Sequence, residues 1–254
     1  MPISIDSGVT DERWSITYDN REVQVEANKR RFSHTLFARD RRGFGNKHPF
    51  DVFFRVLNEF VWFADIRIDD LNGGHGDYCA NLNFRASDDR YLIQLEGFRQ
   101  QVTTEEQHLA LGFFREGQSS GSAFYEFICY AKILEIPFKD GRDKGAWIDQ
   151  AITGLQGDLA LTVRDRRIEM LGGKSLGDWL HEDGRHALSH AKIRAGKTVR
   201  DPNSFMDWDE IKWGNTVMRE LAEKAIVEEL HISVGDAAKY YKNNTEKGGA
   251  GQRR

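Results

Sequence analysis

The chain has 254 residues, of which 39% are hydrophobic and 30% are charged, a composition typical of one large or two smaller globular domains. Its 36 basic and 40 acidic side chains give a net charge of −4, which excludes a generally basic surface, so RNA would have to bind a local basic patch. The two cysteines, Cys79 and Cys129, are too few for a disulfide framework or a four-cysteine zinc site.

The first residues have no basic flank followed by an apolar stretch, and so they do not resemble a signal peptide. The longest apolar runs are far shorter than the roughly 18 residues that a membrane span needs. We therefore expect a cytoplasmic protein that does not enter a membrane.

Short alternating segments predict a β-rich module in the first hundred residues. Residues 14–18 and 22–27 alternate large and polar side chains, and Asp19 and Asn20 between them offer a turn, which predicts a hairpin. Pro49 opens a segment with helical spacing, as expected for proline in a first turn. Further strands are predicted at residues 32–38, 78–86 and 91–95, and the helix at residues 50–64. We therefore predict a β-rich α+β module over residues 1–103.

From residue 104 the pattern becomes helical. Thr103 and Thr104, followed by Glu105 and Glu106, resemble a helix N-terminus with acidic side chains in its first turn. Residues 117–121 contain glycines that predict a kink or a break. Helices are predicted at residues 109–114, 122–134, 146–170, 175–193 and 207–230. The whole chain is thus predicted to be α+β, with a helical bundle over residues 104–238 and a disordered polar tail over residues 239–254.

The segment Arg185-His186-Ala187-Leu188-Ser189-His190 carries the strongest chemical signal. An arginine, a polar residue directly after it and a histidine five positions on match the Arg-polar-x3-His signature of HEPN domains. Many of these small helical domains cleave RNA without a metal. Residues 113–117, 125–127, 132–136 and 179–191 are similar to the HEPN group named after methylamine utilisation protein J. The resemblance covers residues 105–232 and implies a HEPN-like helical bundle.

The resemblance implies a metal-independent endoribonuclease. His190 would remove the proton from a 2′-hydroxyl, a role that suits histidine because its pKa lies near neutrality. Arg185 would stabilise the charge that gathers on the phosphoryl oxygens, and His186 would shape the site. This chemistry needs no cofactor and no metal, and its use of the 2′-hydroxyl makes RNA the substrate.

The motif is incomplete on one helix. Arg185 and His190 lie about 140° apart around an ideal helix, whereas His186 and His190 share a face. HEPN nucleases are typically dimers that bring two copies of the motif together. The resemblance therefore implies a homodimer formed through the HEPN-like domain.

A basic stretch follows the motif. No acidic residue occurs between residues 185 and 200, although the chain as a whole is acidic. We expect this stretch to contact the RNA backbone, with an ordinary solvated loop as the alternative. The predicted RNA-binding residues are Lys192, Arg194, Lys197 and Arg200.

A metal site is a weaker alternative for the same segment. His186 and His190 have the spacing of a helical metal pair, with His181 and His231 as further ligands in that case. Ala187 stands where a zinc-protease motif has its glutamate, so we expect no metal.

Two features of the first module have simple structural explanations. Asp69 and Asp70 are predicted to end a loop, and the glycine-rich residues 73–77 to form a flexible turn. The aromatic side chains between residues 50 and 63 are predicted to form core, with a recognition face as the alternative.

The resemblance implies a HEPN endoribonuclease, expected in the cytoplasm, and by analogy, because an uncontrolled RNase is toxic, a role in stress, in antiviral defence or as a toxin. Its N-terminal module would sense a ligand or a regulatory partner. The alternative is a non-catalytic HEPN protein that binds a nucleotide or a partner, for example as an accessory factor in amine utilisation.

Overall fold

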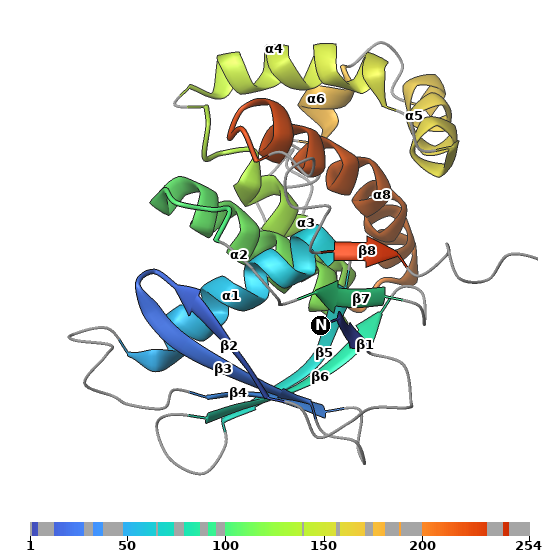
Figure 1. The fold of residues 1–254 in the computed structure, drawn as a ribbon. Coiled ribbons are helices and arrows are strands. Elements are labelled where there is room, and N and C mark those ends of the chain that lie inside the picture. Colours follow the sequence, from blue (N-terminus) through green and yellow to red (C-terminus); the bar gives the residue numbers. More distant parts are fainter. Residues whose placement is uncertain are drawn as a thin grey trace, which may run out of the picture. The chain divides into compact units, whose positions relative to one another are not determined.

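A computed structural model gives the fold. It describes residues 2–4, 13–27, 33–37, 48–64, 66–73, 79–86, 91–94, 100–138, 140–155, 158–170, 175–180, 188, 200–232 and 241–243. The chain divides into two compact units, one formed by residues 1–115 together with 233–254 and the other by residues 116–232. The first unit holds β-sheets and the second is helical, so the predicted α+β class is confirmed (Figure 1).

The first unit contains two antiparallel sheets. The larger sheet has five strands in the order β2-β3-β4-β6-β5, and the smaller has three in the order β1-β7-β8. The larger sheet is built from β2 (Arg13–Tyr18), β3 (Arg21–Ala27), β4 (Ser33–Phe37), β5 (Ile66–Gly73) and β6 (Cys79–Ala86). The smaller is built from β1 (Pro2–Ser4), β7 (Tyr91–Gln94) and β8 (Tyr241–Asn243).

The predicted hairpin is confirmed. Tyr18 in β2 pairs with Arg21 in β3, and the two residues between them form the turn. Asp19 and Asn20 have φ angles of 51° and 59°, the left-handed conformation that a two-residue hairpin turn requires and that these side chains tolerate. The alternation also holds, because Ile16, Tyr18 and Val23 are buried while Ser15 and Thr17 are exposed.

Helix α1 (Pro49–Ala64) supplies much of the core of this unit. Proline occupies its first position, as predicted, because proline lacks an N–H that the first turn would leave unbonded. The aromatic residues Phe53, Phe60 and Phe63 are buried, which confirms that they belong mainly to the core. The other buried apolar residues of the helix follow the same helical spacing and are Val52, Val56, Leu57 and Val61.

The predicted loop end at Asp69 and Asp70 is wrong. Both residues lie within β5, which pairs with β6. The register shifts between Ile68 and Asp70, which places an irregularity of the β-bulge type at Asp69. A bulge breaks the strict alternation of a strand, and this explains why the sequence pattern did not predict β5. Gly73 ends this strand, and residues 74–77 of the predicted turn lie outside the described residues.

Helix α2 (Glu105–Ser119) begins in the first unit, although we predicted the module to end at residue 103. Arg55 of α1 donates two hydrogen bonds to the Glu105 carboxylate, at 2.8 and 2.7 Å. Farther along, the rings of Trp62 and Phe114 pack edge to face with centroids 5.0 Å apart. These contacts attach the helix to α1, so the division of the chain falls after residue 115.

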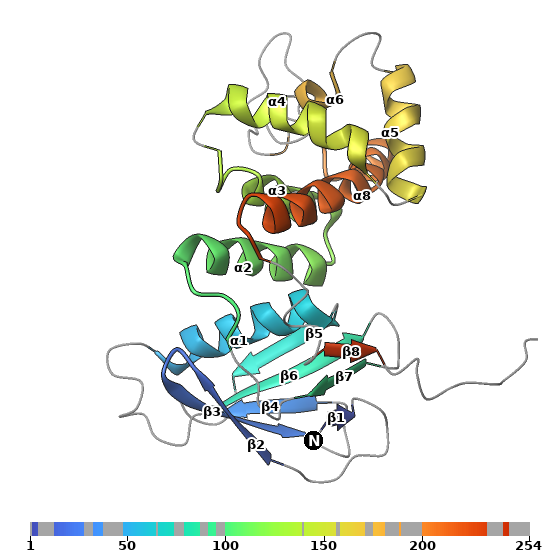
Figure 2. The same cartoon turned by 45° about the horizontal axis from the view of Figure 1, so that its top comes forward.

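The described part of the second unit is helical (Figures 1 and 2). The break predicted between residues 117 and 121 is real: α2 ends at Ser119, and Ser122 caps the next helix by accepting a hydrogen bond from Tyr125 N. The single helix predicted at residues 146–170 is divided around Gly154. The helices are α3 (Ala123–Ile133), α4 (Gly141–Ala151), the 3-10 turn η2 (Ile152–Gly154), α5 (Asp158–Met170), α6 (Leu176–Trp179) and α8 (Phe205–Glu228).

Helices α3 and α8 form the centre of this unit and lie side by side in both ribbon views (Figures 1 and 2). At Gly214 of α8, an added Cβ would lie 3.2 Å from the Trp179 ring and 3.4 Å from the Phe127 ring, so glycine allows the close approach. The end of α8 is tied to α4, because the Trp147 indole donates a hydrogen bond of 2.8 Å to Glu229. The buried apolar residues of α8 are Ile211, Val217, Met218, Leu221, Ala222, Ala225 and Ile226.

Part of the predicted disordered tail has regular structure. Within residues 239–254, Tyr241–Asn243 form β8, which pairs with β7. Backbone pairing with the free edge of β7 gives this polar segment a place in a sheet without requiring a large apolar side-chain face. None of the described helices combines the length and apolarity needed to cross a membrane.

Candidate functional site

Most of the predicted site lies outside the described residues. This applies to Arg185, His186 and His190, and to Lys192, Arg194 and Lys197. Within the six-residue motif the structure describes Leu188, which is helical and half-buried. Of the predicted RNA-binding residues, Arg200 is described.

The chain leading to the motif is attached through α6. Ser175 caps this short helix by accepting a hydrogen bond from Asp178 N. The Gly177 amide donates a hydrogen bond of 3.2 Å to Asp149 of α4, and the absence of a side chain at Gly177 permits this approach. Trp179 is buried beside Gly214 of α8. Two contacts, one to α4 and one to α8, therefore attach the chain just before residue 181.

The chain leaving the motif is attached through Arg200. Its guanidinium donates hydrogen bonds to Glu210 at 2.6 and 2.8 Å and to Asp207 at 2.9 Å. The Asp201 amide adds a bond of 2.9 Å to Asp207. Burial alone would lower the pKa of Arg200, but the bonds and charges of the two carboxylates outweigh it and raise the pKa above its usual value. Arg200 is therefore a permanent cation bound between two anions.

The predicted RNA-binding role of Arg200 stays a prediction, but its side chain already has carboxylate partners. Its side chain is only 7% exposed, and its donors already bind carboxylates. A phosphate would have to compete with both anions for the same guanidinium. We assign Arg200 to the structure of the segment that follows the motif, where it secures the first turns of α8.

A buried polar cluster joins α3 to α8, and the sequence analysis missed it. Asn215 Nδ2 donates to the Ala123 carbonyl at 2.9 Å and to Glu126 Oε2 at 3.0 Å. Tyr130 donates to the other oxygen of Glu126 at 3.2 Å. Burial, followed by the negative charge of Glu126, raises the pKa of Tyr130 far above its usual value, so the phenol stays protonated. The available signal was Asn215 itself, a polar residue on the apolar face of α8.

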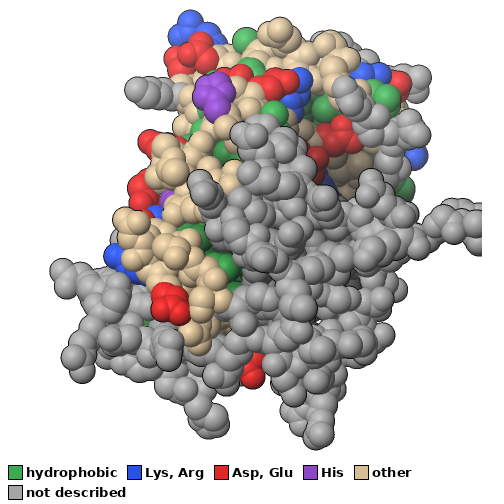
Figure 3. All heavy atoms as spheres, in the orientation of Figure 1, with side chains coloured by type: hydrophobic (Ala, Val, Ile, Leu, Met, Phe, Trp, Pro, Cys, Tyr) green, Lys and Arg blue, Asp and Glu red, His purple; other side chains and the backbone are tan. Residues whose placement is uncertain are grey.

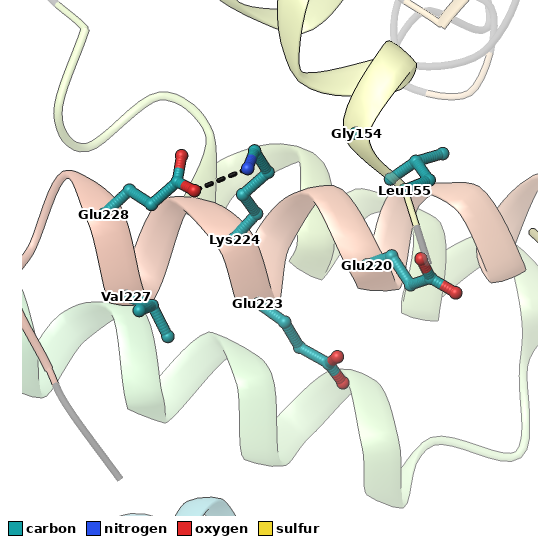
Figure 4. A pocket seen from close by; sticks show the side chains of 7 residues that line it. All are labelled: Gly154, Leu155, Glu220, Glu223, Lys224, Val227 and Glu228. Carbon is teal, nitrogen blue, oxygen red and sulfur yellow. Dashed lines mark hydrogen bonds and ion pairs between the residues drawn. The ribbon is translucent and has the colours of Figure 1, made fainter. Parts of the chain in front are cut away.

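A groove of about 460 Å³ lies along the other end of α8, next to η2 (Figure 4). Lys224 points toward Glu228 and is paired with it, whereas Glu220 and Glu223 point away from the lysine. Three carboxylates and one ammonium line the groove, so its charge disfavours a phosphate. The lining residues are Gly154, Leu155, Glu220, Glu223, Lys224, Val227 and Glu228.

Exposed apolar side chains gather at the start of α8. Phe205 and Met206 are 70% and 75% exposed. The ring of Trp208 stacks on Phe205 with centroids 5.9 Å apart, and Lys212 Nζ lies 4.8 Å from the centre of the Trp208 ring. Acidic residues, among them Asp207 and Asp209, lie on the same turns as Lys212, so this patch lacks the net positive charge that a nucleic-acid backbone attracts.

The distribution of charged side chains and of possible metal ligands can be followed over the described residues. On the face shown in Figure 3, acidic and basic side chains are interspersed over the described part of the molecule. No group of three histidine, cysteine or carboxylate side chains suited to a metal occurs among the described residues. Burial raises the pKa of the Cys129 thiol to about 11, so this cysteine is a core residue and a poor nucleophile.

The comparison with protein families points to the second unit. The model of the family described as methylamine utilization protein MauJ matches residues 110–227. The match runs from α2 to the last turn of α8 and includes the six-residue motif. It thus supports the resemblance to the methylamine utilisation group over less than half of the chain. No curated protein and no solved structure matches the chain.

Proposed function

We propose that the protein cleaves RNA without a metal, through the motif at residues 185–190 in its helical unit. The observation that carries the proposal is the Arg-His-x3-His motif inside the stretch similar to the methylamine utilisation family. Helices attached on both sides of residues 181–199 support it, because a catalytic segment must be held in place at its ends.

In the proposed reaction His190 takes the proton from a ribose 2′-hydroxyl, and the freed oxygen attacks the adjacent phosphorus. The bond from phosphorus to the 5′-oxygen of the next nucleotide breaks, and that oxygen takes up a proton. The products are a 2′,3′-cyclic phosphate and a 5′-hydroxyl. Arg185 stabilises the negative charge on the phosphoryl oxygens, and His186 positions the groups around them.

A second copy of the chain completes the site in this proposal. Positions five apart, such as 185 and 190, would lie about 140° apart around an ideal helix, so a symmetric dimer would supply the missing group from the partner chain. The first unit would then control the activity by binding a ligand or a regulatory protein. Lys192, Arg194 and Lys197 remain the proposed RNA-backbone contacts.

The direct test is RNA cleavage by the purified full chain in the presence of a chelator. We expect Arg185→Ala and His190→Ala each to reduce the rate by about 100-fold or more, the range for loss of an acid/base residue or a charge-stabilising donor. The products should carry 2′,3′-cyclic phosphate ends, which phosphatase and mass spectrometry identify.

Two matched controls separate catalysis from folding. Arg142→Ala removes an exposed arginine of α4. His231→Asn removes an exposed histidine, and asparagine tolerates the backbone φ of 57° at this position. Both should retain the wild-type rate. Cleavage that the chelator abolishes would contradict the metal-free mechanism and favour His186 and His190 as metal ligands.

A second candidate function is a non-catalytic accessory role in amine utilisation, as the description of the matched family suggests. In that case the wild-type chain would cleave no RNA in any of these assays. Deletion of its gene would instead impair growth on methylamine, and the His190→Ala variant would restore that growth as well as the wild type.

A further inference from the structure

Glu59 is a buried carboxylate in the middle of α1 that the proposed function does not use. The residue is 0% exposed, although glutamate is almost never fully buried unless it is paired. Hydroxyl and amide groups surround the carboxylate, and no cation of the described residues forms an ion pair with it. An ionised Glu59 therefore incurs a large desolvation cost.

The carboxylate joins three separate parts of the first unit. Oε1 accepts hydrogen bonds from the Tyr18 hydroxyl at 2.7 Å and from the Val102 amide at 3.1 Å. The Gln101 amide donates to both oxygens, at 3.2 and 3.1 Å. Glu59 thus connects the end of β2 and the segment 100–102 to α1. This segment leads directly into α2, which crosses from the first unit into the second.

The side chain of Gln100 adds to the same attachment. It accepts a hydrogen bond of 2.9 Å from the Asp19 amide and donates one of 2.6 Å to the Val102 carbonyl. The segment 100–102 is therefore bound on one side to the hairpin turn and on the other to Glu59.

Three ionisable side chains lie on the neighbouring elements, and the two arginines among them pair with other carboxylates. Arg55, one turn earlier on α1, binds Glu105 of α2, and Arg21 binds Asp19 in the hairpin turn. His108 of α2 lies beside Tyr18, with ring centroids 6.4 Å apart. Burial consequently dominates and raises the pKa of Glu59 to about 7, while the hydrogen bonds from Tyr18, Gln101 and Val102 oppose the rise.

A neutral Glu59 can satisfy all of these groups. The Tyr18 hydroxyl lies 3.4 Å from the Arg55 carbonyl as well as 2.7 Å from Glu59. A protonated Glu59 can donate to the Tyr18 oxygen, and the Tyr18 hydroxyl then donates to the Arg55 carbonyl. Oε2 then still accepts from the Gln101 amide, and the Val102 amide, 3.1 Å from Oε1, can donate to a lone pair of the protonated oxygen. No buried polar group of this cluster is left without a partner, and no charge is buried.

We propose that Glu59 is a pH-dependent attachment site for the segment 100–102, closed when its carboxyl is protonated and released when it ionises. Opening exposes the carboxylate to water, where its ordinary acidity returns. Loss of the proton therefore favours the open form, and the start of α2 is held less firmly as the pH rises. This inference is independent of the proposed RNA chemistry.

Amide hydrogen exchange of the full chain tests the proposal, with rates corrected for intrinsic exchange between pH 5 and 8.5. We expect protection at Gln101 and Val102 to fall by up to about tenfold per pH unit below neutrality and to level off above it, as one linked proton requires. Glu59→Gln is permanently neutral and nearly isosteric, so its protection should stay constant with pH. Glu105→Gln removes an exposed carboxylate and should keep the wild-type pH dependence.

A second measurement follows the carboxyl itself by carbon-13 NMR. Tyr18→Phe removes the hydroxyl that stabilises the ionised form, so the Glu59 titration midpoint should move to higher pH. The proposal fails if wild-type protection at residues 101 and 102 does not change with pH. It also fails if Glu59→Gln keeps that change, or if protection falls equally across the whole first unit.

Discussion

Gly177 and Gly145 lie close together on α6 and α4 but have opposite surroundings. A Cβ at Gly177 would lie 2.8 Å from Asp149 Oδ1 and 3.4 Å from the Gly145 carbonyl, whereas a Cβ at Gly145 meets no atom within 4 Å. We expect Gly177→Ala to lower the free energy of unfolding by about 1–3 kcal/mol, because Asp149 must move and its hydrogen bond to the Gly177 amide is lost.

The matched variant Gly145→Ala should raise the stability by about 0.5–1 kcal/mol, because alanine is the better residue inside a helix. Urea unfolding followed by circular dichroism measures both effects. Equal effects of the two variants would contradict the steric explanation. The pair also tests whether α6 is attached to α4 just before the motif.

Substitutions at Arg200 distinguish a role of this side chain in stability from a role in RNA binding. Replacing it with alanine leaves Asp207 and Glu210 close together without their cation, so we expect a loss of about 2–4 kcal/mol in unfolding free energy. Arg200→Lys should lose less, since it keeps the charge but not the two-pronged geometry. RNA affinity of the folded Arg200→Lys protein should equal that of the wild type in a fluorescence-anisotropy titration.

The pH dependence of this cluster has a defined sign. Burial tends to raise the pKa of Asp207, but the hydrogen bonds from Asp201 and Arg200 and the charge of Arg200 lower it below its usual value. The stabilisation is therefore complete above the ordinary pKa of about 4 and is lost as the pH falls through the lower folded value.

In the affinity titration, a large decrease in RNA affinity for Arg200→Lys would support an RNA-binding role for this side chain.

At the level of elements, sequence patterns predicted the helices and the hairpin where local signals were strong. Asp19 and Asn20 specify their turn through left-handed backbone angles, and the apolar spacing of α8 matches its buried face. The pattern failed at β5, where a register shift at Asp69 disrupts alternation, and around Gly154, where apolar spacing continued across an interruption of the helix. At β5 the pairing with β6 decides the structure, and apolar periodicity alone does not record such pairing.

We expect strand β8 to stabilise its neighbour β7, and a shortened chain tests this. A chain ending at residue 238 lacks Tyr241–Asn243, so β7 loses one of its two partners in the smaller sheet. We expect increased amide exchange at Tyr91 and Ile93, with exchange at Leu221 in the second unit unchanged. Exposed strand edges also pair between molecules, so light scattering should show concentration-dependent association. Unchanged exchange in β7 would contradict a stabilising role for β8.

In the whole molecule, the sequence predicted candidate site residues only where the residue types and their spacing are distinctive. Arg185 and His190 stand out because their spacing matches a known motif, whereas Glu59 has no such signal. Its environment arises from Tyr18, 41 residues earlier, and from the amides of Gln101 and Val102, about as far along the chain in the other direction. Arg200 likewise has partners that its place at the end of a basic run does not indicate, namely carboxylates 7 and 10 residues later.

The strand order of the smaller sheet determines when the first unit can be completed during synthesis. β1 and β7 precede the helical unit in the chain, and β8 follows it. A ribosome therefore releases all of residues 116–232 before the strand that finishes the earlier unit emerges. The helical unit can fold first, while the first unit still lacks β8 and leaves one edge of β7 unpaired. Until residues 241–243 have been synthesised, the nascent chain therefore exposes that edge to neighbouring polypeptides.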